Sequence, residues 1–491
     1  MKEATKAAQV SPEPSALELL MIPGAHAGIK AHYASLSARA QDFALALIEP
    51  EFVILDTETT GFDAKSDALI EVAAAIICGN EVLDTFSTFV NPERPIPPRI
   101  TEITNISDAE VADAPLADEV MYDLIAFCGN RPIVAHNAPF DQAFIRGNYE
   151  RLAEPVPQEA VPLLSSDLWI DTVELARIAL PLLKEYNLAA LSAVFAPECR
   201  STHRAIDDVL ALVKVWRAIL VALGDLPGGL CGFLARSFPE QAWSSRPVLK
   251  LVAGSQKAEG RSFDLNAVRE SLTRHLAEQQ KVDAVELEGG IAQLIPVEKA
   301  ELAAEYSPSG LLGAMYPEYE TRCEQLEMAE AVADAFNTAG MAAIEAGTGV
   351  GKSMAYLLPA ALFAKRNGVT CGVATKSNAL LDQLIYHELP RLNAALQAQG
   401  AGGLEYLSLK GYEHYPCLRK LLKPPPANKT YRGHPSLSAQ LLSYVCQSVS
   451  GDIDALALHR GDVPRFEYLA SAEDCLGHRC RQYRCCLLHS M

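Results

Sequence analysis

The stretch FVILDTETTG, residues 52–61, decides the fold. Its apolar residues lead into Asp56 and Glu58, which are separated by a single residue. Alternate residues of a β-strand point to the same face, so both carboxylates lie on one side of the strand. Such a pair is costly beside apolar residues unless a cation or hydrogen bonds compensate it. The stretch therefore predicts a strand that ends in a cation site, although a lone Asp-x-Glu is more often a solvated surface pair.

Two later stretches add acidic residues to the same domain-sized span. AHNAPFD places Asp141 at an expected strand-to-helix junction, and HRAIDD places His203 and Asp208 at the start of a strongly periodic helix. Four carboxylates suit a pair of Mg²⁺ ions, which prefer oxygen ligands and together assist the cleavage of a phosphodiester. His203 is the natural general base, because an ordinary imidazole titrates near neutral pH. A helix cap or a surface pair is the ordinary alternative for His203 and Asp208.

The surrounding pattern is rich in strands first and in helices later. The residues after 27 predict a helix, whereas residues 1–27 are expected to be poorly ordered. The expected elements that follow are strands over 51–57 and 69–90, the latter turned at Gly79-Asn80, a short strand running into a helix over 131–152, and a helix over 202–223.

In this order the motifs resemble the DnaQ-like, DEDDh family of 3′–5′ exonucleases, over residues 51–222. DTETTG, AHNAPFD and HRAIDD stand for its three motifs, and DTVELARIALP, from Asp171, is similar to the segment between them. The resemblance implies a ribonuclease H-like fold and single-stranded DNA, or else RNA, as substrate. It implies that His203 is the base, that Asp207 is a less expected ligand than Asp208, and that Thr59 and Asn137 position substrate. The implied ligands of Mg²⁺ or Mn²⁺ are Asp56, Glu58, Asp141 and Asp208.

The stretch IEAGTGVGKSMAY, residues 344–356, is typical of a strand, a phosphate-binding glycine loop and a helix. Lys352 would reach the β- and γ-phosphates of ATP, and Ser353 would hold Mg²⁺. A fortuitous glycine turn is the alternative. Strands are expected over 341–346 and 369–375, and helices over 323–336 and 352–366. The loop residues predicted to contact ATP are Gly347, Thr348, Gly349, Gly351, Lys352 and Ser353.

Two stretches beside this loop resemble helicase motifs. YETRCEQLEMAEAV resembles the Q-type motif that holds adenine, with Arg322 and Gln325 at its positions. VATKSNALLDQL resembles the next motif, which touches single-stranded DNA, through Thr375. No DEAH-like run follows Ser353, so nucleotide binding is expected to be weak at most and DNA unwinding is not expected from this chain alone.

The tail DCLGHRCRQYRCC, residues 474–486, concentrates cysteines. Zinc, disulfides, free structural thiols and an iron–sulfur cluster are the alternatives; the paired C-x2-C of most zinc sites is missing from this tail. A cluster needs four thiolates, and Cys417 can complete the set. The arrangement resembles iron–sulfur helicases of the DinG/XPD type, over residues 316–491. It implies a 4Fe–4S cluster on Cys417, Cys475, Cys480 and Cys486, the last preferred to Cys485 by spacing.

The sequence thus predicts an α/β protein with four parts. They are an extension over 1–50, partly disordered and then helical, an exonuclease domain over 51–223, a connector over 224–312, and an incomplete P-loop (RecA-like) helicase domain over 313–491 with an inserted cysteine segment over 410–491. The chain is expected to be the N-terminal half of a fused exonuclease–helicase, naturally truncated or one piece of a split protein.

Composition limits the classes of function. A net charge of −19 argues against a protein that coats nucleic acid, but not against an enzyme that acts through a local groove. No apolar run approaches the ~20 residues that span a bilayer, so a cytoplasmic protein without a membrane partner is expected. One alternative function is a nucleic-acid-binding or regulatory module. The other is a split-helicase subunit that acts with a separate C-terminal half in DNA repair or replication.

Overall fold

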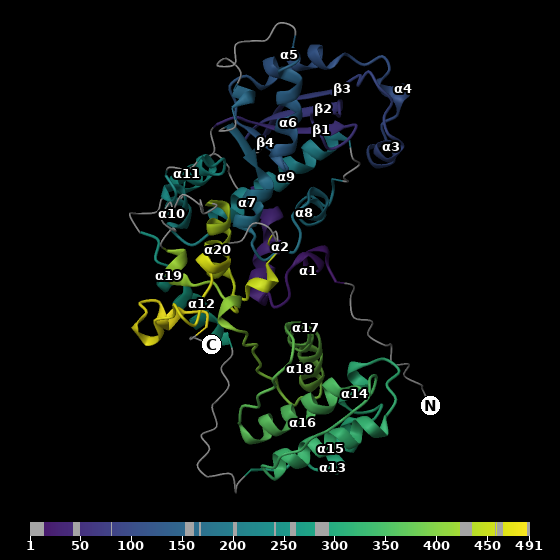
Figure 1. The fold of residues 1–491 in the computed structure, drawn as a ribbon, viewed down its shortest axis with the longest axis vertical. Helices are drawn as coiled ribbons and strands as arrows, with labels where there is room; N and C mark the ends of the chain where they lie inside the picture. Colours follow the sequence, from purple (N-terminus) through teal and green to yellow (C-terminus); the bar gives the residue numbers. More distant parts are fainter. Residues whose placement is uncertain are drawn as a thin grey trace. The chain divides into compact units, whose positions relative to one another are not determined.

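The structure is a computed structural model that describes most of the chain. It divides into two compact units, Met1–His275 with Tyr412–Met491, and Leu276–Gly411 (Figure 1). In the part that is described, no helix is long and apolar enough to cross a membrane. The described residues are 14–42, 50–79, 81–152, 162–165, 168–199, 204–239, 242–255, 262–279, 294–422, 435–456, 458 and 465–488.

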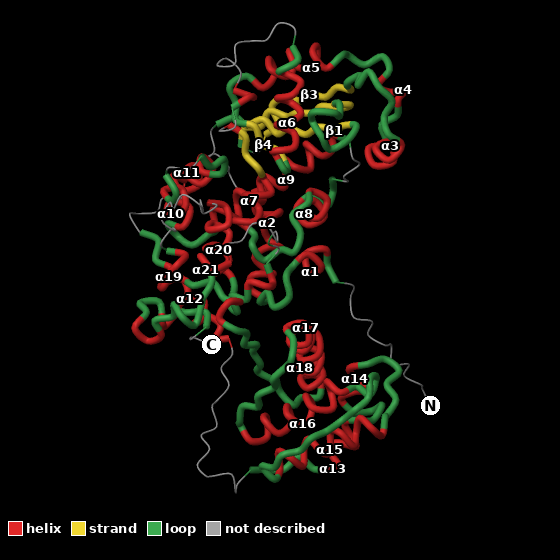
Figure 2. The backbone as a smooth tube through the Cα atoms, in the orientation of Figure 1, coloured by secondary structure: helices red, strands yellow, loops and turns green. Residues whose placement is uncertain are grey.

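The first unit is built on one mixed sheet, drawn in yellow in Figure 2. The sheet has five strands in the order β3-β2-β1-β4-β5. The central strand β1 pairs antiparallel with β2 and parallel with β4. The predicted strands are confirmed, and a fifth was not expected. Their bounds are β1 Phe52–Thr59, β2 Leu69–Cys78, β3 Glu81–Phe89, β4 Ile133–Ala135 and β5 Trp169–Asp171.

Helices cover both faces of this sheet because its inner strands are apolar on both sides. Along β1, Phe52 and Ile54 belong to the core on one face, while Val53 and Leu55 belong to the core on the other. The first core is shared with the predicted helix α9 (Ala205–Gly224). There, the rings of Trp216 and Phe52 pack edge to face, with their centres 5.5 Å apart. The second is shared with α5 (Ala117–Cys128) and α6 (Ala138–Tyr149).

The N-terminal region contains more structure than the sequence suggested. Helix α1 (Ala16–Leu20) forms within the range expected to be poorly ordered, because Ser15 and Glu18 cap its N-terminus reciprocally and Leu17 and Leu20 are buried. Residues 1–13 lie outside the described part.

The remaining helices between residues 27 and 279 are α2 Ala27–Asp42, α3 Pro98–Thr104, α4 Asp108–Val111, η3 Pro162–Leu164, α7 Thr172–Ala179, α8 Leu188–Phe195, α10 Leu230–Arg236, α11 Arg246–Ser255 and α12 Leu265–Gln279.

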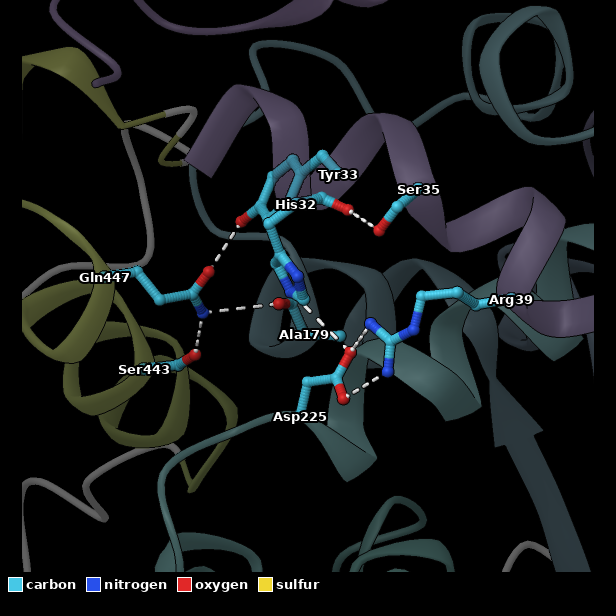
Figure 3. Close-up of polar contacts among 8 residues, drawn as sticks. All are labelled: His32, Tyr33, Ser35, Arg39, Ala179, Asp225, Ser443 and Gln447. Carbon is cyan, nitrogen blue, oxygen red and sulfur yellow. Dashed lines mark hydrogen bonds and ion pairs between the residues drawn. The ribbon is translucent and has the colours of Figure 1, made fainter. Parts of the chain in front are cut away.

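The described residues of the cysteine segment from Tyr412 onward pack into the same hydrophobic core as the sheet. Figure 3 shows one anchor: Tyr33 donates to Gln447 at 2.8 Å, and Gln447 donates to the carbonyl of Ala179 at 3.3 Å. Beside it, Arg39 forms a forked pair with Asp225. The helices of this segment are η7 Tyr412–His414, α19 Leu418–Leu421, α20 Pro435–Gln447, η8 Ile453–Ala455, α21 Arg465–Tyr468, η9 Gly477–Arg479 and η10 Tyr483–Cys485.

The second unit consists of helices and loops in its described residues (Figure 2). The strand predictions for 341–346 and 369–375 are wrong for this structure. Both segments lack regular secondary structure: Met341, Ile344 and Val373 are exposed, and no neighbouring strand supplies hydrogen bonds to these described residues. Its helices are α13 Lys299–Glu305, α14 Leu311–Met315, the expected α15 Cys323–Asn337 and α16 Lys352–Asn367, then α17 Asn378–Gln383, the π-helical turn η6 Leu384–Glu388 and α18 Leu389–Ala398.

The two units divide the chain differently from the four predicted parts. Residues 412–491 group with the sheet, although the sequence placed them with the glycine loop. The reason is physical: apolar residues of this segment complete a core that the sheet and α9 begin. The division into two compact units does not test the four domain ranges predicted from the sequence, which stay a prediction.

Candidate functional site

Strand β1 and helix α9 gather three carboxylates at one end of the sheet. Asp56 and Glu58 point to the α9 face by the alternation of the strand, and Asp208 lies in the first turn of α9. One oxygen from each lies within 4.8 Å of the others. The structure therefore brings together three of the four predicted metal ligands as one group.

The fourth carboxylate, Asp141, is held from the other face of β1. Thr57 alternates with Asp56 and Glu58, and its hydroxyl donates to Asp141 Oδ1 at 2.7 Å. Asp141 lies in the first turn of α6 and is 2% exposed. It lies outside the three-carboxylate group, but its charge acts on Asp56.

Burial and mutual repulsion oppose the ionisation of these acids. Burial first, and then the charges of Asp141, Glu58 and Asp208, raise the pKa of Asp56 well above its usual range. Burial and the charge of Asp208 raise the pKa of Glu58 to about 8. Burial raises the pKa of Asp141 to about 7 against the opposing hydrogen bond from Thr57. Oxygen-only donors with crowded negative charge fit Mg²⁺ or Mn²⁺, which would offset the repulsion.

Two residues that the sequence reasoning missed hold α9 against the sheet. Glu71 on β2 lies opposite Glu58, is 1% exposed, and accepts a hydrogen bond from Ala205 N at 3.0 Å, at the start of α9. Arg204 donates to the same carboxylate from Nη2 at 3.0 Å and lies 4.8 Å from the centre of the Phe89 ring. The sequence signal that could have revealed this role is Glu71 itself, a single acidic residue inside the otherwise apolar run of β2. His203, the predicted base, lies outside the described residues.

The predicted substrate residues lie close to the carboxylates. Thr59 donates to the carbonyl of Gly61 at 2.6 Å, and the backbone N–H of Asn137, in the left-handed region at φ 64°, donates to Asp171 at 3.0 Å. The sequence reasoning also missed Phe62, which is 80% exposed immediately after Gly61. An exposed aromatic ring is a surface on which a nucleobase can stack.

In the second unit, the glycine loop lies directly before α16. Gly349 and Gly351 both adopt φ 86°, which favours glycine, and α16 begins at Lys352. Lys352 Nζ donates to the carbonyl of Ala346 at 3.0 Å. The remaining predicted loop residues, Gly347, Thr348 and Ser353, lie in or next to this turn.

The two predicted adenine contacts touch this loop. Arg322 Nη1 donates to the carbonyl of Gly349 at 2.6 Å, and Gln325 Nε2 donates to that of Gly351 at 2.9 Å. The structure therefore brings the Q-type stretch and the glycine loop together. Thr375 donates to the carbonyl of Ser377 at 3.1 Å, just before α17.

The four predicted cluster ligands line one cavity in the first unit. Backbone pairing joins the two parts of the segment: Cys417 N donates to Tyr468 O at 2.8 Å, and Ala470 N donates to Tyr415 O at 2.9 Å. The twelve cysteines, all of which lie within the described residues, form no disulfide. No three of the described thiols bring their sulfurs within 4.8 Å of one another, as a compact single zinc ion would need. The cavity is lined by Cys417, Cys475, Cys480 and Cys486, among others.

The neighbouring Cys485 is placed differently. Its side chain is buried, and its Sγ donates to Asn266 Oδ1 at 2.9 Å. Burial raises the pKa of the Cys485 thiol to about 11. Cys485 is not among the residues that line the cavity, whereas Cys486 is. Arg419 and Lys420, which follow Cys417, donate to the backbone carbonyls of Asp474 and Leu469, respectively.

Comparison with known proteins identifies the sheet-bearing region. Residues 53–216 match the family model described as Exonuclease. Residues 53–216 are an exonuclease domain. The resemblance to DnaQ-like exonucleases expected from the motifs is thereby confirmed for this domain.

Relatives match the exonuclease domain alone or much more of the chain. The 3′-5′ exonuclease DinG of Bacillus subtilis (strain 168) is 28% identical over 424 residues, which are 86% of this chain and 43% of that protein. DNA polymerase III PolC-type of Caldanaerobacter subterraneus subsp. tengcongensis is 36% identical over 181 residues, 37% of this chain and 12% of that protein. The chain therefore spans less than half the length of the DinG relative. The expected resemblance to DinG is confirmed.

A solved structure of Exonuclease X in complex with 5′ overhanging duplex DNA is 23% identical to this chain. It covers 41% of this chain and 99% of the other, with a TM-score of 0.27. That score is too low to support an argument about the site, so the geometry of the exonuclease domain rests on its own sheet and carboxylates.

Replacing Arg204 tests whether the contact with Glu71 positions the first turn of α9 in the exonuclease domain. We expect Arg204→Ala to lower the free energy of unfolding by about 2 kcal/mol, because it removes charged hydrogen bonds to a buried carboxylate. We also expect weaker Mn²⁺ binding, because the same turn carries Asp208. Chemical denaturation and Mn²⁺ titration measure the two effects.

Arg131→Ala is the matched control, since Arg131 pairs with Glu51 at a more exposed place in the same domain. Removing that pair should lower the free energy of unfolding by about 1 kcal/mol or less and leave Mn²⁺ binding unchanged. Equal effects of the two substitutions on Mn²⁺ binding would contradict a positioning role for Arg204.

Proposed function

We propose that this chain is a metal-dependent 3′–5′ exonuclease that releases mononucleotides from single-stranded DNA, with RNA as a second substrate class to test. The observation that carries the proposal is the group of three carboxylates within 4.8 Å inside an exonuclease domain. The similarity to DinG and to polymerase III relatives supports a role in DNA repair or replication, and a cytoplasmic location goes with it.

In this proposal each residue of the site has a separate task. Asp56, Glu58, Asp141 and Asp208 hold Mg²⁺ or Mn²⁺, which supplies charge stabilisation to the phosphodiester and its attacking water. His203 accepts the proton of that water, a role that rests on the HRAIDD motif. Thr59, Asn137 and Phe62 position the 3′ end, the aromatic ring by stacking on a base. Thr57 holds Asp141 by a hydrogen bond on one face of β1, and Glu71 holds the start of α9 by a hydrogen bond on the other.

Asp56→Ala tests this assignment. It removes a central ligand of the proposed site, so we expect Mg²⁺-dependent digestion of single strands to fall by at least about 10³-fold, on the order of 4 kcal/mol in transition-state stabilisation. The measurement is mononucleotide release from strands labelled at the 3′ or the 5′ end, which also reports the polarity.

The control is Asp123→Ala, which removes an exposed carboxylate on α5 of the same domain and should leave the rate unchanged. Persistent cleavage in the Asp56 variant would overturn the metal-site assignment. Binding of single strands without any digestion by the wild-type chain would favour the rival function, a nucleic-acid-binding or regulatory module.

We further propose that the second unit is an incomplete P-loop (RecA-like) helicase domain that binds ATP weakly and contacts DNA through Thr375. Support comes from the contacts of Arg322 and Gln325 with the glycine loop. The exposed apolar residues of segments 341–346 and 369–375, such as Met341, are what a completed parallel sheet would bury. A separate C-terminal helicase half is the partner that this proposal calls for.

Lys352→Ala tests the nucleotide site. We expect the wild-type chain to bind a fluorescent ATP analogue with a Kd at or above about 0.1 mM, which corresponds to a binding free energy near −5.5 kcal/mol. The variant should lose measurable binding, because the phosphates no longer contact a lysine. Lys376→Ala, on an exposed residue of the same unit, should bind like wild type. Rapid ATP hydrolysis that depends on Lys352 would contradict the incomplete helicase domain, and binding that survives Lys352→Ala would contradict the loop assignment.

We propose that the cysteine cavity holds a 4Fe–4S cluster on Cys417, Cys475, Cys480 and Cys486. The lining of one cavity by all four thiols supports this, because a cluster of this kind is held by four cysteine thiolates. Polar groups also reach the sulfurs: Gly477 N donates to Cys475 Sγ at 3.4 Å. Such hydrogen bonds are a usual way in which a protein adjusts a cluster.

Adjacent serine substitutions separate the proposed ligand from its neighbour. After anaerobic reconstitution with iron and sulfide, Cys486→Ser should lose most of the broad absorbance near 400 nm and at least one equivalent of bound iron, because a thiolate ligand is missing. Cys485→Ser should retain both, because Cys485 is bonded to Asn266 instead. The opposite ranking of the two variants would overturn the ligand assignment, and colourless wild-type protein would overturn the cluster.

A further inference from the structure

Helix α12, in the connector to which the sequence assigned no function, contains a completely buried cation. Arg269 is 1% exposed. Its Nη1 donates to the carbonyls of Val445, at 3.0 Å, and of Ser448, and its Nη2 donates to that of Val449 at 3.4 Å. These carbonyls lie at the C-terminal end of α20, where an arginine is a favourable partner.

Carbonyl groups alone leave the charge of Arg269 uncompensated. No carboxylate forms an ion pair with Arg269 in the described part of the chain, and its buried Nε has no hydrogen-bond partner there. A buried unpaired cation is expensive unless a negative group lies close to it. The charge therefore calls for an anion that side-chain carboxylates of the described residues do not provide.

Several cysteines lie around Arg269. One helical turn earlier on the same face of α12, Asn266 accepts a hydrogen bond from Cys485, the direct neighbour of Cys486. Cys446 follows Val445, whose carbonyl Arg269 holds. The guanidinium interacts electrostatically with Cys446, Cys485, Tyr444 and Cys486, and both Cys446 and Cys485 are buried. Of these four residues, Cys486 is the one that lines the cysteine cavity.

We propose that Arg269 is the counter-cation of the cysteine centre, a positioning residue that stabilises the centre's negative charge from the α12 side. Four thiolates give the centre an excess of negative charge, and net charge and burial set the potential of such centres. A fixed cation nearby favours the reduced, more negative state. This inference rests on the proposed cluster, and it adds a function to a helix outside the cysteine segment.

The test compares reduction midpoints in the full chain after anaerobic reconstitution, followed by bleaching near 400 nm. We expect R269Q to need a lower potential than wild type, by at least a tenfold change in the one-electron equilibrium, which is about 59 mV. R269K keeps the charge without the forked hydrogen bonds and should stay within that limit. R274Q removes an exposed charge from the same helix and should match wild type.

Each outcome decides the proposal. An R269Q midpoint equal to wild type overturns it, and so does a shift of R269K as large as that of R269Q, which would show a purely structural cap on α20. If R269Q does not fold, R269K carries the test alone: a tenfold shift overturns the proposal, and an unchanged midpoint supports it. Absence of any cluster in the wild-type chain is a separate result, which overturns the cluster proposal and this inference with it.

Discussion

Asp56, Glu58 and Asp208 place three carboxylates within 4.8 Å of one another, at the end of a strand whose preceding residues are buried. Much of the surrounding structure limits the cost of that arrangement. Thr57 ties Asp141 to the strand from the opposite face, and Arg204 brings one positive charge to Glu71. These contacts hold the acids in place but do not neutralise them. The exonuclease domain therefore keeps a concentration of negative charge that a divalent cation can complete.

The cysteine segment shows the opposite balance of charge. There, Arg269 is a buried cation beside cysteine side chains that belong to the core of the first unit. The proposed function leaves the compensation of the charge at each site to a bound inorganic group. A protein built in this way links its stability to the metals available to it, because a group that binds only the folded state stabilises that state.

Local patterns carried most of what the sequence could predict. The alternation in FVILDTETTG placed Asp56 and Glu58 on one face, and the periodicity of α9 placed Asp208 in its first turn. The role of Glu71 depends on the register of β2 against β1, which one sequence does not reveal. The strands expected near Met341 failed because a parallel strand depends on neighbours as much as on its own residues. The burial of α20 in the exonuclease core had no local signal at all.

That burial has a consequence for the order of folding. Tyr33 and Gln447 share a hydrogen bond although they are 414 positions apart, and α20 completes the core that α2 and α7 begin. At a synthesis rate of about 5–20 residues per second, roughly 20–80 s separate the appearance of these two residues. Throughout that interval this core lacks the residues of α20, while the second unit is made. The last part of the core can therefore form only after residues 435–447 have been synthesised.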